Sequence, residues 1–106
     1  MVTREIIEII RTYLCELEQN GVHISRAFLY GSQARGAATT ESDIDLMLVS
    51  PLFDSEYYEY LPAIWFSDFR TEHRIEPFIV GEKRFLTDDT SPIIGIVKKE
   101  GIEIAA

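Results

Sequence analysis

Residues 30–50 read YGSQARGAATTESDIDLMLVS, and the second half of this stretch decides the fold. Apolar residues dominate that half, and a short apolar run bounded by polar residues is typical of a buried strand. We therefore predict a strand over residues 43–49. Because residues two apart on a strand share one face, Asp43 and Asp45 should project side by side, while Ile44 points into the core.

The two aspartates are a candidate cation site. Two carboxylates held this close repel each other and are costly to bury unless a cation lies between them. A site with only oxygen ligands suits Mg²⁺, which keeps some water molecules and takes other ligands from substrate phosphates. The alternative is a solvated strand end at which Asp43 and Asp45 face water, because an Asp-x-Asp pair is a weak signal by itself.

A Gly-Ser turn precedes the aspartates and is a candidate phosphate site. Gly31 and Ser32 directly follow an apolar segment, predicted as a strand over residues 26–30. Glycine lets the backbone turn sharply, and the amides of a following short helix, predicted at residues 33–35, favour an anion. Ser32 and Arg35 can donate to the same phosphate. The alternatives are an ordinary strand-to-helix turn and a surface arginine. Gly36 is expected to end this short helix with positive φ.

These residues together resemble a known enzyme family. Gly31-Ser32, Gly36 and Ser42-Asp43-x-Asp45 are similar to the GS…G…SDxD signature of the minimal nucleotidyltransferases, relatives of the DNA polymerase β catalytic domain. The resemblance implies that the aspartates bind two Mg²⁺ ions and that the Gly-Ser turn holds a nucleoside triphosphate. It also implies transfer of a nucleoside monophosphate to a hydroxyl, with release of pyrophosphate.

The resemblance implies a third carboxylate on a neighbouring strand, and Glu76 is the candidate. It lies in a predicted strand over residues 74–80, where it alternates with Ile75 and Pro77 and can face Asp45 if the strands are neighbours. The family usually has Asp at this position. By resemblance Glu76 would bind the metal and help to take the acceptor's proton. The alternative is an edge-strand glutamate in water, since Pro77 prefers sheet edges.

The order of the remaining elements predicts an α/β (α+β) fold. Ile6, Ile10 and Leu17 recur at helical spacing, Thr3 can begin that helix, and Gly21 can end it. Further predictions are helices over residues 56–69 and 91–101 and a short edge strand over residues 102–104. We therefore expect residues 1–106 to form a single domain. Its small mixed sheet should have three or four strands, with helices packed on one face.

Composition limits the possible partners and compartment. The chain has 106 residues, 46% of them hydrophobic, and a formal charge of −8, so direct binding of nucleic acid is disfavoured. Cys15 is the single cysteine and excludes an intramolecular disulfide. Glu5 and Glu8 interrupt the first apolar residues, so neither a signal peptide nor a membrane span is expected. These features favour the cytoplasm.

The resemblance also suggests a partner. Minimal nucleotidyltransferases commonly act as antitoxins for HEPN-domain proteins, and some attach AMP to a tyrosine of that partner. We therefore expect transfer of AMP from ATP to a HEPN toxin, with Asp43, Asp45 and Glu76 holding Mg²⁺ and Gly31, Ser32 and Arg35 binding the nucleotide. The alternatives are transfer to tRNA or to a small molecule, and an antitoxin that acts by contact alone. An oligomer is possible in any of these cases.

Overall fold

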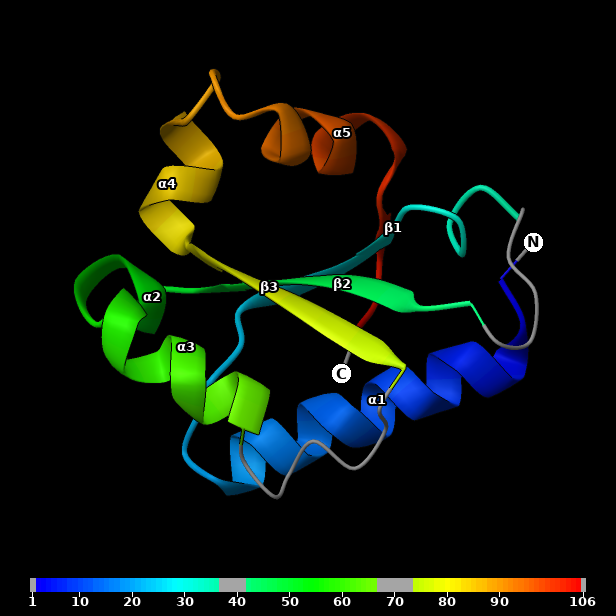
Figure 1. The fold of residues 1–106 in the computed structure, drawn as a ribbon, viewed down its shortest axis with the longest axis horizontal. Coiled ribbons are helices and arrows are strands. Elements are labelled where there is room, and N and C mark those ends of the chain that lie inside the picture. The colour runs from blue at the N-terminus through cyan, green and yellow to red at the C-terminus, as the bar shows by residue number, and fades with distance from the viewer. Residues whose placement is uncertain (1, 37–41, 67–73, 106) are drawn as a thin grey trace.

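The predicted strand at Asp45 lies inside a mixed sheet (Figure 1). The computed structural model describes residues 2–36, 42–66 and 74–105, and within them four strands form one sheet in the order β3-β2-β1-β4. β2 is parallel to β3, while β1 is antiparallel to both of its neighbours. Along the chain the elements are α1 (Arg4–Gln19), β1 (Arg26–Tyr30), β2 (Ile44–Ser50), α2 (Leu52–Ser55), α3 (Tyr57–Phe66), β3 (Ile75–Gly81), α4 (Glu82–Thr87), α5 (Pro92–Glu100) and β4 (Ile102–Glu103).

Helices cover both faces of this sheet, which corrects the expectation of one covered face. On β2, Ile44, Leu46 and Leu48 join a core with α1, α2 and α3, while Met47 and Val49 join a second core with α4 and α5 (Figure 1). β2 is therefore apolar on both sides, as is usual for a central strand with a parallel neighbour. The stripe of α1 that packs on the first face consists of Ile6, Ile10, Tyr13, Leu14 and Leu17.

The predicted ends of the first and last helices are confirmed. The Thr3 hydroxyl accepts a hydrogen bond from the Ile6 amide at 3.3 Å, and Gly21 has φ +82° just after α1. Ser91 caps α5, whose first residue is Pro92, and its hydroxyl accepts from the Ile94 amide at 3.4 Å. These are local interactions, which explains why a sequence pattern could identify them.

Other boundaries differ from the predictions. The helix expected over residues 56–69 is observed as α3, with Pro62 inside it, and residues 67–69 lie outside the described ranges. The short helix α2, which precedes this segment, was not predicted. The short helix expected at residues 33–35 is a hydrogen-bonded turn. α4 was not predicted. The Asp54 carboxylate, from α2, accepts from the amides of Lys83 and Arg84 at 2.9 and 3.4 Å, so the start of α4 depends on a residue distant in sequence.

No helix in the described ranges has both the length and the apolar character needed to cross a membrane.

The segment between α4 and α5 is organised by Asp88. One carboxylate oxygen accepts from the Thr90 amide, the Thr90 hydroxyl and the Ser91 amide at 2.9, 2.9 and 3.1 Å, and the other accepts from Arg84 Nε at 3.1 Å. These contacts, first of all the bond from the Thr90 amide, hold the pKa of Asp88 well below its usual range. The folded state therefore favours the ionised carboxylate.

The stabilisation by Asp88 should depend on pH. Because its pKa is lower in the folded than in the unfolded state, the stabilisation is complete above the unfolded value of about 4 and is lost as the pH falls toward the folded value. Asp88→Ala should lower the free energy of unfolding at pH 7, and the difference from wild type should shrink below pH 4. Urea unfolding at both pH values measures this, with the exposed neighbour Asp89→Ala as the control. An Asp88→Ala effect of equal size at pH 7 and pH 2.5 would contradict the assignment.

Candidate active site

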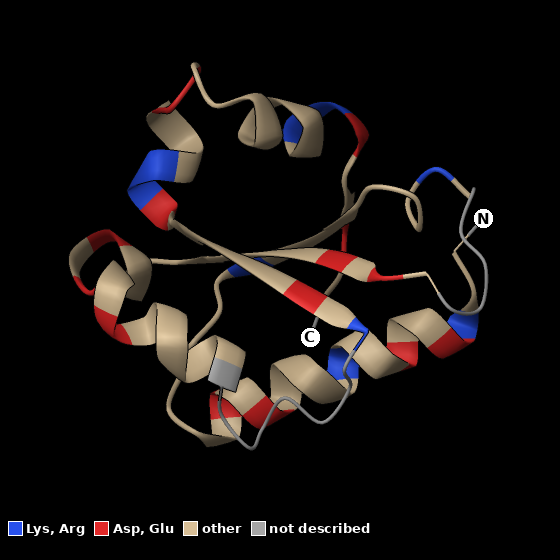
Figure 2. Ribbon diagram, in the orientation of Figure 1, with Lys and Arg blue, Asp and Glu red and all other residues tan. Residues whose placement is uncertain are grey.

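The register of the sheet places three polar side chains in one row. Asp45 on β2 is paired with Tyr30 on β1 and with Glu76 on β3. Side chains of directly paired residues project to the same face of a sheet, so these three are lateral neighbours. Figure 2 shows acidic positions side by side on β2 and β3, with basic positions in the turn after β1 and at the start of β3. The predicted proximity of Glu76 to the Asp-x-Asp segment is therefore present in the fold.

Nearby charges influence the ionisation of Asp45 and Tyr30 in this row. Partial burial raises the pKa of Asp45, the nearby Asp43 carboxylate raises it further, and Arg35 opposes the rise. Burial also raises the pKa of Tyr30 to about 12, and the charges of Asp45 and Glu76 add to the effect. The Tyr30 phenol is accordingly neutral at physiological pH. The repulsion between the Asp43 and Asp45 carboxylates is the arrangement expected of a cation site.

The Gly-Ser turn lies directly against Asp45. Gly31 has φ +74°, and a Cβ atom built on it would overlap the Asp45 carboxylate. The turn is closed by a hydrogen bond from the Arg35 amide to the Gly31 carbonyl at 3.1 Å, and Gly36 has the expected positive φ of +72°. A phosphate bound at Ser32 would therefore lie beside the aspartates. Because the turn replaces the predicted helix, the site has no helix N-terminus at this position.

Two residues that were not predicted to belong to the site, Gln33 and Arg74, bind the backbone just before β2. The Ser42 carbonyl accepts from Gln33 Nε2 at 3.4 Å and from Arg74 Nε at 3.2 Å. The Arg74 carbonyl in turn accepts from the Ile44 amide at 2.7 Å. Ser42 directly precedes Asp43, so these contacts fix the chain next to the first carboxylate. The residue types did not indicate this role, because a glutamine or an arginine at these positions could equally be an ordinary surface residue.

The residues predicted to bind metal differ in exposure. Asp43 and Glu76 are exposed and Asp45 is half-buried. Within residues 2–36, 42–66 and 74–105, no three His, Cys, Asp or Glu side chains gather closely enough to hold a metal ion by themselves. The oxygen donors of Asp43 and Asp45 fit Mg²⁺ when water and substrate phosphates supply the other ligands. Binding of the metal by Glu76 remains a prediction.

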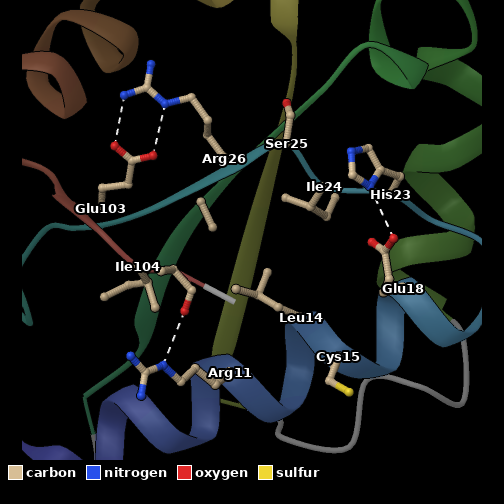
Figure 3. Close-up of a pocket in the computed structure, with 12 residues that line it drawn as sticks. Arg11, Leu14, Cys15, Glu18, His23, Ile24, Ser25, Arg26, Glu103 and Ile104 are labelled. Atoms are coloured by element: carbon tan, nitrogen blue, oxygen red, sulfur yellow. Dashed lines mark hydrogen bonds and ion pairs between the residues drawn. The ribbon is translucent and has the colours of Figure 1, made fainter.

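A separate cavity of about 590 Å³ lies between α1 and the edge formed by β1 and β4 (Figure 3). Arg26 and Glu103 pair across its rim at 2.8 Å, and His23 contacts Glu18 at 3.1 Å. Arg11 Nε donates to the Ala105 carbonyl at 3.2 Å. The lining includes none of the residues predicted to bind metal or nucleotide, and it meets β1 at its first residues, whereas Tyr30 is the last. The cavity is therefore not part of the candidate active site.

Comparison with known proteins assigns the fold and the family. A profile of the nucleotidyltransferase domain matches residues 7–105, so this chain belongs to the nucleotidyltransferase domain family. The fold is similar to a crystal structure from Sulfolobus solfataricus, of a protein to which nucleotidyltransferase activity has been ascribed, with a TM-score of 0.64. The two share 15% sequence identity over 93% of this chain and 78% of that chain, which supports the fold alone. None of the curated protein sequences matches this chain.

The close approach of Gly31 to Asp45 predicts the effect of substituting Gly31, and the same substitution at Gly21 is the control. Gly31→Ala and Gly21→Ala should each cost about 1–2 kcal/mol of stability, because both glycines have positive φ. Only Gly31→Ala should also weaken binding of a Mg²⁺–nucleotide complex, since a Cβ at Gly21 has no atom within 4 Å. Urea unfolding and calorimetric titration measure the two effects separately. Equal nucleotide affinity in both variants would show that the turn at Gly31 does not contribute to the site.

Proposed function

We propose that this chain is a Mg²⁺-dependent enzyme that transfers AMP from ATP to a hydroxyl of a HEPN-domain partner protein, and so acts as the antitoxin of that partner. The observation that carries the proposal is the position of Asp45, which is paired with Glu76 on one side and touches the Gly31 turn on the other. Carboxylates and a phosphate-binding turn are the two components that nucleotidyl transfer needs in contact.

In this proposal the carboxylates serve the metal and the proton transfer, and the turn serves the phosphates. Asp43 and Asp45, with Glu76, would hold Mg²⁺, which when bound neutralises the charge of the triphosphate. Ser32 and Arg35 bind the β- and γ-phosphates. The acceptor oxygen forms a bond to the α-phosphorus, and the bond from that phosphorus to the bridging oxygen of the β-phosphate breaks. Glu76 takes the acceptor's proton, and pyrophosphate leaves with the bonding electron pair.

Charge supports a protein as the acceptor. The chain carries 18 acidic and 10 basic residues, and a field of this sign repels a polyanion such as RNA. The HEPN partner and the antitoxin role rest on the resemblance of the Gly31-Ser32 and Asp43-x-Asp45 motifs to minimal nucleotidyltransferases. Transfer to tRNA or to a small molecule and neutralisation by contact alone are the competing outcomes of the test below.

The test compares the intact protein with Asp43→Asn/Asp45→Asn and with Asp89→Asn, which removes an exposed carboxylate far along the chain from these residues. Each is incubated with α-phosphate-labelled ATP, Mg²⁺, the purified HEPN partner, tRNA and a lysate of the source organism. Label should appear on the partner with wild type and Asp89→Asn. The double variant should be at least about a hundredfold slower, because lost charge stabilisation at such a site costs several kcal/mol of barrier.

Each alternative has its own outcome. Label on tRNA or on a small molecule would keep the chemistry and replace the acceptor. Neutralisation of the partner by the double variant, with no label from wild type, would identify an antitoxin that acts by contact. Labelling by the double variant at the wild-type rate would reject Asp43 and Asp45 as metal ligands.

A further inference from the structure

Gln33 is a buried amide inside the predicted phosphate-binding turn. It is 7% exposed and, with Ser50, is one of the two buried polar side chains in the described part of the chain. Of the neighbouring residues in the turn, Ser32 is half-buried and Arg35 is exposed. Burying an amide is unfavourable unless it makes hydrogen bonds, so its partner indicates its purpose.

That partner is the backbone next to the first aspartate. Gln33 Nε2 donates to the Ser42 carbonyl at 3.4 Å, and the amide orientation is unambiguous because a carbonyl oxygen can only accept. Arg74, just before β3, donates to the same carbonyl from Nε at 3.2 Å. The carbonyl that precedes Asp43 is thus held from the turn on one side and from the β3 strand on the other.

Asp43 needs this support more than Asp45 does. Asp45 lies within β2, where pairing with Tyr30 and Glu76 fixes its backbone. Asp43 precedes the first residue of β2 and is exposed, so the strand ladder does not fix its backbone in the same way. Two carboxylates at residues 43 and 45 also repel each other, which acts to separate them.

We propose that Gln33 is a positioning residue that keeps the Asp43 carboxylate beside Asp45 and so couples the phosphate-binding turn to the metal-binding pair. The inference rests on the proposed function for its metal site, and it adds a residue whose hydrogen bond goes to the backbone that precedes Asp43. Groups that orient metal ligands typically change metal affinity by about 10–100-fold when they are removed.

The test measures metal binding directly, without catalysis. Gln33→Met keeps the length of the side chain and removes the donor, and Gln19→Met makes the same change at an exposed position on α1. Free Mn²⁺ is followed by electron paramagnetic resonance in the presence of an ATP analogue with a methylene bridge between the α- and β-phosphates. Gln33→Met should weaken Mn²⁺ binding about tenfold. Metal-free affinity for the analogue and the unfolding midpoint should match those of Gln19→Met.

A second variant separates positioning from folding. Gln33→Glu has the same size but places an acceptor against the Ser42 carbonyl, so it should lose more Mn²⁺ affinity than Gln33→Met. Equal Mn²⁺ affinity in wild type and both variants would overturn the positioning role and leave the proposed function intact. Parallel losses of Mn²⁺ affinity and metal-free analogue affinity would also overturn it, because they indicate a general support for the turn. Absence of Mn²⁺ binding in wild type would overturn the proposed function itself.

Discussion

The pairing of β2 with β1 and β3 determines the positions of both the core residues and the candidate site. Ile44, Leu46 and Leu48 are buried on one face, and a slip of one residue would move them out of that core. The same slip would turn Asp45 into the core. Burial of the apolar residues therefore fixes the face on which the carboxylate stands and, through the register, its neighbours Tyr30 and Glu76. Fold and candidate site share one set of interactions.

The site contains an unfavourable electrostatic arrangement that folding alone does not require. Asp45 is partly desolvated beside a second carboxylate, and its pKa is raised as a result. Gly31 must remain a glycine both because of its positive φ and because the Asp45 carboxylate occupies the space that a Cβ atom would need. Local conflicts of this kind are expected where a protein binds a cation and an anion together, since the ligands relieve the repulsion.

The sequence predicted the elements that depend on local patterns. The strand at residues 26–30 has the predicted bounds, β2 and β3 are displaced by one residue, and the caps at Thr3 and Ser91 are confirmed. Features that depend on distant contacts were missed. α4 begins where the Asp54 carboxylate reaches it from α2, and the second covered face depends on α4 and α5 packing over β2. The pairing of Asp45 with Glu76 was predicted only on the condition that their strands are neighbours.

The central claim is that the Gly31 turn, the two aspartates and Glu76 form one metal and nucleotide site. Its most direct test is a titration of ¹⁵N-labelled protein with Mn²⁺ and a non-hydrolysable ATP analogue, followed by NMR, because Mn²⁺ broadens the amide signals nearest to it. We expect the amides of residues 31–33, 43–45 and 76 to broaden together at the lowest Mn²⁺ concentration. Broadening confined to other acidic segments, such as those around Glu18 or Asp88, would contradict it.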